Sequence, residues 1–176
     1  MNEAKATDDA PSAEVEALFR AHGAYVMRAA RYLGVAERDL DDVVQEVFLV
    51  ALRRASQFRG NADAKSWLYG IALRVVSAYR RRAHRRREVP TADLAHRGGA
   101  TADPMERRTA RSLVNRALEA LDEDKRAVFV LFELEELTMR EVARAQGCHL
   151  KTAYSRLYAA REIMRGELRR LSKEEE

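Results

Sequence analysis

The stretch that decides the fold class is residues 138–161, TMREVARAQGCHLKTAYSRLYAAR. Thr138 stands three residues before Glu141, which is the capping-box spacing that satisfies two free amides at the start of a helix. Ala143 is small enough for two helices to approach closely, and Gly147 permits a turn before a second helix begins. The stretch therefore predicts a helix-turn-helix.

The second helix of this stretch carries polar, basic and aromatic side chains on its outward face. They are Lys151, Thr152, Tyr154, Ser155, Arg156, Tyr158 and Arg161. These side chains are rich in hydrogen-bond donors for phosphates and base edges, so we predict that the helix reads duplex DNA. The alternative is an ordinary helical hairpin with a solvated basic face.

The sequence before residue 138 shows further helices and one interruption. Apolar residues recur at helical spacing at Leu113, Ala117, Leu118, Leu121, Ala127, Val128, Leu131 and Leu134. Between residues 88 and 108 the periodicity stops, and two prolines and a glycine pair interrupt a polar segment. We therefore predict a flexible linker over 88–108 and a helical domain over 109–176.

Three amphipathic stretches precede the linker. The first runs from Val15 to Leu33, with Ser12 placed to cap its start and Gly34 to end it. The second has an apolar stripe of Leu40, Val43, Val44, Val47, Phe48, Ala51 and Leu52. The third starts near Asp63 and carries its apolar face into an arginine block. They predict a helical domain over 13–87 with one small core, after a disordered tail over 1–12.

No segment alternates with a period of two over a strand's length, so the fold class is all-α, with two small helical domains joined by a flexible linker. A 47% hydrophobic fraction in 176 residues supports real cores. The longest apolar runs have six residues, whereas a membrane span needs about 20. One cysteine cannot form an internal disulfide, and no secretion signal is evident, so we expect a cytoplasmic protein without membrane insertion.

Charge is divided along the chain. Residues 74–87 hold seven arginines and no acidic residue, whereas residues 37–46 hold five acidic residues against one arginine. Arginine suits phosphates and guanine edges, but an arginine-rich composition also follows from a GC-rich genome, and composition does not decide between the two. Separate basic and acidic regions indicate more than one macromolecular partner.

Residues that carry catalytic or metal chemistry do not cluster in the sequence. The four histidines are scattered, and none has a second ligand at metal-site spacing. There is no phosphate-binding glycine loop and no recognisable pair of nucleophile and base. We expect no metal, no cofactor and no enzymatic activity, and we interpret Cys148 as a small buried residue rather than a thiol switch.

Several motifs together resemble one protein family. The acidic stretch 39–48, DLDDVVQEVF, resembles the core-binding motif of region 2 in bacterial RNA polymerase sigma factors of the extracytoplasmic-function (ECF) class. Residues 58–61 (FRGN) and 66–72 (SWLYGIA) look like that family's promoter-melting segment, and 79–82 (YRRR) like the end of its downstream-element helix. Residues 117–121, 126–129 and the helix-turn-helix are similar to its region 4. The resemblance covers about residues 15–171, in the family's order.

The resemblance implies a promoter-specificity subunit that recognises the minus-35 and minus-10 elements and assists DNA melting. Core RNA polymerase would contact Asp39, Asp42, Gln45, Glu46 and Leu49. The downstream element and the melted strand would contact Phe58, Arg59, Gly60, Asn61, Trp67, Arg74, Tyr79, Arg80, Arg81 and Arg82. The upstream element would contact the outward face of the last helix. Expected partners are core RNA polymerase, promoter DNA and an anti-sigma factor.

In this interpretation the loop after Phe58 holds a flipped base, and Trp67 anchors the helix behind it. Base flipping costs a few kcal/mol, which stacking at about 1–3 kcal/mol per base can offset. Trp67 also lies on the apolar stripe of its helix, so a role in the hydrophobic core is the alternative.

Four positions depart from the family pattern. Arg74 stands where the family has Asn, Ala78 where it has Asp, and Gly70 where a basic residue is usual. Arg74 can bind a guanine or a phosphate, and we favour the phosphate because the rest of that face is built of arginines. Asp122 replaces a proline but is itself a good N-cap, so the helix start should survive.

Two other functions stay open on the sequence. The chain could be a helix-turn-helix regulator that acts without polymerase and oligomerises through its first domain, or an interaction protein that only retains the fold. An acidic helix beside a melting-type aromatic loop favours the sigma subunit, because a simple repressor has no evident use for either.

Overall fold

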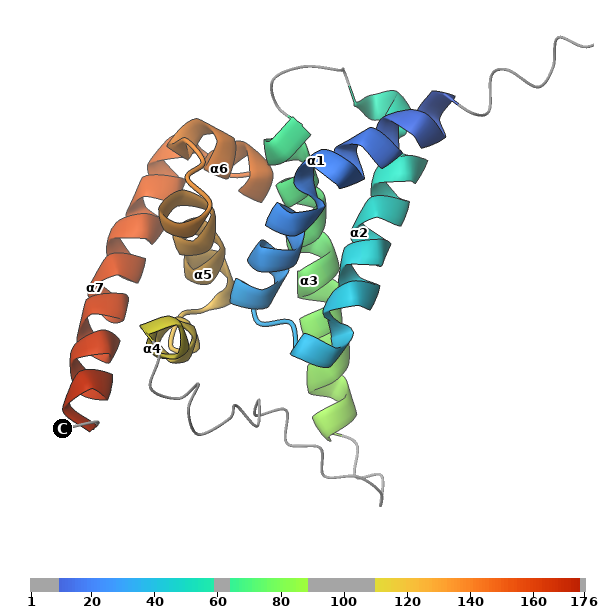
Figure 1. Cartoon of the computed structure of the whole chain (residues 1–176). Helices are drawn as coiled ribbons and strands as arrows, with labels where there is room; N and C mark the ends of the chain where they lie inside the picture. The colour runs from blue at the N-terminus through green and yellow to red at the C-terminus, as the bar shows by residue number, and fades with distance from the viewer. Residues whose placement is uncertain (1–9, 59–63, 89–109, 175–176) are drawn as a thin grey trace, which may run out of the picture.

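The protein, seen in a computed structural model, is described over residues 10–58, 64–88 and 110–174 (Figure 1). These ranges contain α-helices, short 3-10 turns and one π-helical turn but no strand, which confirms the all-α prediction. The predicted tail (1–12) and linker (88–108) fall largely outside the described residues. Arg59, Gly60 and Asn61 fall outside them as well.

The first helical unit consists of α1 (Ala10–Tyr32), α2 (Leu40–Arg53) and α3 (Ala64–Glu88), with 3-10 turns η1 (Glu37–Asp39) and η2 (Ala55–Gln57) beside α2. The prediction that Ser12 caps α1 is wrong, because the helix already begins at Ala10. Pro11 fits the first turn, where a missing N–H costs nothing. Gly34 follows the end of α1 with a positive φ of 95°, as predicted for a helix stop.

The second helical unit consists of α4 (Ala110–Leu118), α5 (Glu123–Phe129), the π-helical turn η4 (Val130–Leu134), α6 (Met139–Gln146) and α7 (Leu150–Glu174). The capping box is present: Thr138 accepts from the Glu141 amide, and the Glu141 carboxylate accepts from the Thr138 amide. Gly147 has a φ of 64°, which glycine adopts without strain. The helix-turn-helix of α6 and α7 is therefore confirmed.

The N-cap predicted at the start of α5 is also present. Asp122 has an extended backbone, and its side chain accepts a hydrogen bond from the Lys125 amide at 2.8 Å. The Lys125 ammonium group, and then the Lys125 amide, lower the pKa of Asp122. Aspartate thus takes over the helix start for which the family commonly uses proline.

The two units pack against each other, and neither hydrophobic cluster is confined to one of them (Figure 1). One cluster joins the stripes of α1, α2 and α3 to Leu118, Leu121 and Met164 of the second unit. The other inserts Ala29 and Tyr69 of the first unit among the apolar side chains of α5, α6 and α7. In Figure 1, α1 and α3 lie nearest the second unit, and α2 lies on the far side.

Candidate functional site

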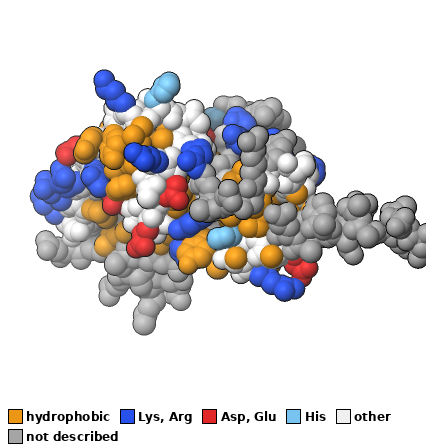
Figure 2. Space-filling view, turned by 90° about the horizontal axis from the view of Figure 1, so that it is seen from above, with side chains coloured by type: hydrophobic (Ala, Val, Ile, Leu, Met, Phe, Trp, Pro, Cys, Tyr) orange, Lys and Arg blue, Asp and Glu red, His pale blue; other side chains and the backbone are white. Residues whose placement is uncertain are grey.

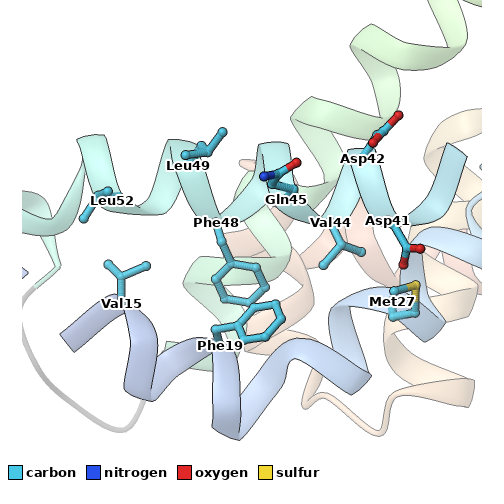
Figure 3. A pocket seen from close by; sticks show the side chains of 10 residues that line it. All are labelled: Val15, Phe19, Met27, Asp41, Asp42, Val44, Gln45, Phe48, Leu49 and Leu52. Atoms are coloured by element: carbon cyan, nitrogen blue, oxygen red, sulfur yellow. The ribbon is translucent and has the colours of Figure 1, made fainter. Parts of the chain in front are cut away.

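An apolar groove of about 440 Å³ lies between α1 and α2 (Figure 3). It is lined by Val15, Phe19, Met27, Asp41, Asp42, Val44, Gln45, Phe48, Leu49 and Leu52. Phe19 and Phe48 point toward each other between the helices, with their ring centroids 4.9 Å apart in an edge-on arrangement. Phe19 is 51% exposed and Leu49 is 45% exposed. The groove therefore presents large apolar side chains to solvent beside two carboxylates.

The residues predicted to contact polymerase divide into two groups. Asp42, Gln45 and Leu49 line the groove together. Asp39 instead accepts a hydrogen bond from the Tyr79 hydroxyl at 2.7 Å, and Glu46 forms an ion pair with Arg82 at 3.2 Å.

The sequence did not reveal the apolar part of the groove. Leu52 belongs to the predicted apolar stripe, yet it is 39% exposed, and Phe19, within the first amphipathic stretch, is half exposed. Helical periodicity shows which residues share a face, but it does not show where a neighbouring helix stops covering that face.

The start of α3 carries the aromatic pair of the predicted melting segment. The rings of Phe58 and Trp67 lie 4.8 Å apart, and Trp67 is half-buried against the hydrophobic core. Both interpretations of Trp67 fit this placement, because the side chain packs on the core while part of it stays exposed.

The arginines farther along α3 lie in different surroundings. Arg74, Arg81 and Arg82 are exposed, and Arg81 donates to the Ser77 hydroxyl at 2.7 Å. Tyr79 is less available, because its hydroxyl donates to Asp39 and accepts from the Ala36 amide. Burial, and then the bond to Asp39, raise the pKa of Tyr79.

The predicted DNA-reading face of α7 is largely exposed. Lys151, Thr152 and Ser155 are open to solvent, and Tyr154 and Tyr158 stack with their ring centroids 6.4 Å apart. Figure 2 shows basic and hydrophobic side chains intermixed on the side of the molecule where α6 and α7 lie.

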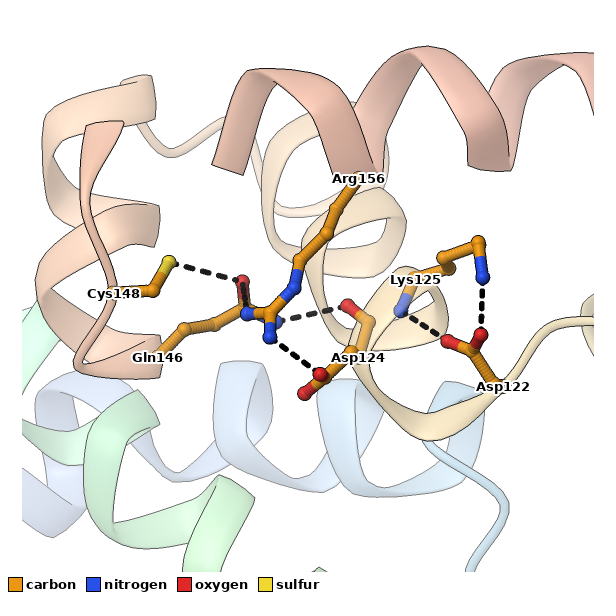
Figure 4. A network of polar contacts seen from close by, with 6 residues as sticks. All are labelled: Asp122, Asp124, Lys125, Gln146, Cys148 and Arg156. Atoms are coloured by element: carbon orange, nitrogen blue, oxygen red, sulfur yellow. Dashed lines mark hydrogen bonds and ion pairs between the residues drawn. The ribbon is translucent and has the colours of Figure 1, made fainter. Parts of the chain in front are cut away.

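Two arginines of this face are held by carboxylates. Arg156 reaches from α7 to Asp124 and to the amide oxygen of Gln146 (Figure 4). Arg161 pairs with Glu133 at 2.6 Å. Cys148 is half-buried rather than buried as we expected, and its Sγ lies 3.8 Å from the Gln146 oxygen.

Within the described ranges, no group of three or more histidine, cysteine, aspartate or glutamate side chains could hold a metal ion. No helix there is long and apolar enough to cross a membrane. The candidate site consists of the exposed surfaces on α2, α3 and α7 described above.

Comparison with known proteins assigns the family. Residues 18–86 match the family model for Sigma-70 region 2, and residues 111–164 match that for Sigma-70 region 4. The chain is 34% identical over 143 residues to the ECF RNA polymerase sigma-E factor of Escherichia coli K12, with 74% of each chain covered. The chain belongs to the ECF sigma factor family. The sigma-E factor of Haemophilus influenzae is 30% identical over 148 residues, with 78% of each covered.

Solved structures agree with this assignment. CnrH in complex with the cytosolic domain of CnrY is 27% identical, has a TM-score of 0.66, and is matched over 88% of this chain and 86% of that one. The sigma factor RpoE of Bartonella quintana, in complex with the anti-sigma factor NepR, has a TM-score of 0.67 at 20% identity over 92% and 98% of the chains. At 20% identity, the likeness to RpoE shows a shared fold and nothing further.

Family membership confirms the function that the resemblance implied. The chain is a promoter-recognition sigma subunit, and a helix-turn-helix regulator that acts without polymerase is not favoured. Sigma factors are non-catalytic subunits that act on RNA polymerase in the cytoplasm.

Proposed function

We propose that the groove between α1 and α2, with the carboxylates on its rim, is the surface through which this sigma factor binds core RNA polymerase. The supporting observation is the combination of exposed Phe19, Leu49 and Leu52 with Asp41 and Asp42 around one concave surface. Exposed apolar side chains favour association because binding removes them from water. Carboxylates at the rim favour a basic partner and speed its encounter.

Asp39 and Glu46 contribute to this surface in different ways. Asp39 fastens η1 to α3 through the Tyr79 hydroxyl, so it positions the start of α2. Glu46 and Arg82 are both substantially exposed, and such a surface pair is worth at most about 1 kcal/mol. Glu46 can therefore exchange Arg82 for a cation of the polymerase at little cost.

The start of α3 and the arginines along it serve the downstream promoter element. Phe58 and Trp67 offer aromatic surface for an unstacked base, since their rings already lie together. The exposed Arg74, Arg81 and Arg82 then hold phosphates of the same strand.

The outward face of α7 serves the upstream element. Lys151 and Thr152 lie in its first turn, where a recognition helix contacts base edges and phosphates. Asp124 and Gln146 hold Arg156 in one orientation, which lowers the entropy lost when its guanidinium meets DNA.

The proposal also includes an anti-sigma factor, the absence of catalytic activity and the cellular compartment in which the chain acts. We expect an anti-sigma factor as a further partner, as the resemblance implies; the RpoE structure that shares this fold holds one. We further propose that the chain has no catalytic activity of its own and acts in the cytoplasm, where sigma factors meet the polymerase.

Binding of the full chain to core polymerase tests the groove. The Asp41→Lys, Asp42→Lys double variant should bind at least tenfold more weakly, because it reverses the charge of the rim. Glu162→Lys on α7 changes an exposed carboxylate outside the groove and should bind as the wild type does. Equal affinity of the double variant and the wild type would remove the groove from the interface.

A further inference from the structure

Helix α7 carries a second apolar face in addition to the one that packs in the core. Its core face consists of the buried side chains Ala153, Leu157, Ala160, Met164 and Leu171. Leu150, Tyr154 and Tyr158 lie elsewhere on the helix and are 40%, 41% and 61% exposed. Three large apolar side chains are therefore open to solvent on the helix for which we propose a role at the upstream element.

The three exposed side chains form a ridge, which we call the 150–158 ridge. They are spaced four residues apart, so each stands one turn beyond the last on the same side of the helix. The rings of Tyr154 and Tyr158 stack with their planes 24° apart. From Leu150 to Tyr158 the helix rises about 12 Å, which is about the rise of three to four base pairs of DNA. The ridge is thus continuous and matches a short run of base pairs in length.

The surroundings of the ridge favour DNA as its partner. Residues 150–161 hold three basic side chains and no acidic one. Lys151, Thr152 and Ser155 are exposed in the same turns and can donate hydrogen bonds to phosphates and base edges. Exposed apolar side chains rimmed by polar groups mark a binding site, and the positive charge around them selects a polyanion.

The position of the ridge within the helix-turn-helix directs it at bases. Helix α7 begins at Leu150, shortly after the turn at Gly147. In this motif the N-terminal residues of the second helix contact base edges in the major groove. The ridge occupies the first, fifth and ninth positions of α7, so it lies within the part of the helix that enters the groove.

The major groove presents one methyl group, the C5-methyl of thymine, and apolar side chains discriminate thymine by covering it. Tyrosine suits this contact, because its rigid ring offers a large area and loses little conformational entropy on binding. Arginine, which reads guanine, is less available in these turns, since Arg156 and Arg161 already pair with Asp124 and Glu133. The side chains of the ridge thus fit thymine better than any other base.

We propose that the 150–158 ridge reads thymine. It packs against C5-methyl groups in the upstream promoter element, while Lys151, Thr152 and Ser155 hold the neighbouring phosphates and base edges. Burial of one methyl group corresponds to about fourfold in affinity, so several covered methyl groups multiply into a large preference. The inference rests on the proposed role of α7 and adds the base and the chemical group that this helix selects.

Replacement of thymine by deoxyuridine tests the ridge, because it removes the methyl group and leaves the hydrogen-bonding groups of the base in place. Holoenzyme assembled from the full chain and core polymerase first selects its promoter from duplexes randomised over both promoter elements. The selected upstream element should contain thymine on one or both strands. The same duplex with deoxyuridine at those positions should bind the holoenzyme about fourfold more weakly for each methyl group that the ridge covers.

Variants of the two tyrosines assign this loss to the ridge. The Tyr154→Ala, Tyr158→Ala variant keeps good helix formers at exposed positions, and it should bind the thymine and deoxyuridine duplexes about equally. The Tyr154→Phe, Tyr158→Phe variant keeps the rings without the hydroxyl groups and should keep the wild-type ratio of the two affinities. Tyr25→Ala on α1 is the matched control, because Tyr25 is also 41% exposed, and it should keep that ratio as well.

The outcomes separate the ridge from the proposed function. A selected upstream element without thymine, equal wild-type affinity for the two duplexes, or an unchanged ratio in the double alanine variant would each overturn the ridge alone. Weaker binding of that variant to core polymerase without DNA would make the ridge a protein contact and overturn it too. If selection enriches no base in the upstream element, the proposed role of α7 fails, and the ridge fails with it.

Discussion

The helices α2 and α3 of the first unit present opposite kinds of surface. On α2, the side chains Leu49 and Leu52 are exposed beside Asp42, and nothing in the described part of the chain covers them. On α3, the side chains Ser66 and Tyr69 are almost fully buried beneath the second unit. One three-helix unit therefore keeps one face open to solvent and packs the other against the rest of its own chain.

The largest expected effect is on the free energy of unfolding. It is seen by comparing Glu135, which is bound by Tyr69 of α3, with Glu46 on α2. Glu135→Ala should lower the free energy of unfolding by about 2–3 kcal/mol, because it leaves the buried Tyr69 hydroxyl without its acceptor. Glu46→Ala removes only an exposed pair with Arg82 and should cost less than about 1 kcal/mol. Urea unfolding of both variants measures their free energies of unfolding. Similar losses in the two variants would contradict the difference between the two faces.

Apolar residues give a second comparison between the exposed α2 face and the buried α3 face. Ile71→Val in α3 should cost about 0.5–1.5 kcal/mol, because the side chain is 2% exposed and loses a buried methyl group. Leu49→Ser on the groove should change stability by no more than about 0.5 kcal/mol while weakening polymerase binding. A large stability loss for Leu49→Ser would mean that this residue belongs to the core.

Replacing Arg126 should have a smaller effect on stability, and it should stabilise the chain rather than destabilise it. Arg126→Met should stabilise the chain by about 1 kcal/mol, because it removes a buried cation that lacks a full set of partners. The pKa of Arg126 is about 10 in the folded chain, below the usual value of arginine, so burial disfavours its charged form. The advantage of the variant should be full below pH 10 and shrink as the pH rises through that pKa. Thermal unfolding at several pH values measures it, and an advantage that grows with pH would contradict the assignment.

The smallest expected change is in transcription when Arg74 is replaced. Because Arg74 is exposed and its helix continues into an arginine block, Arg74→Ala should lower transcription from many promoter variants by a similar factor and keep their rank order. Transcription from a set of downstream-element variants tests this expectation. A loss confined to promoters with one particular base would make Arg74 a base reader.

Local sequence signals predicted most of the helices. The capping box at Thr138, the turn at Gly147 and the N-cap at Asp122 depend on neighbours within four residues, and all three are present. The buried stripe of α7 is equally local, since its period alone marks Leu157 and Met164 as inward-facing.

The features that the sequence did not reveal depend on distant residues. Glu135 is an ordinary acidic residue in the sequence, and the Arg28 side chain that donates to it lies 107 positions away. Gly70 departs from the family pattern, and the sequence does not show that it lies against the Ala145 carbonyl of another helix, 3.4 Å from where a Cβ would stand. The exposed part of the groove depends likewise on where α1 stops covering α2.

The distance between the two units is the most direct test of an open α2 face and a closed α3 face. Spin labels at Arg53→Cys and Lys173→Cys, in a Cys148→Ser background, report that distance by pulsed electron paramagnetic resonance. The free chain should show one narrow distance, because the two units share both hydrophobic clusters. A broad distribution of distances in the free chain would contradict the packing of the two units against each other.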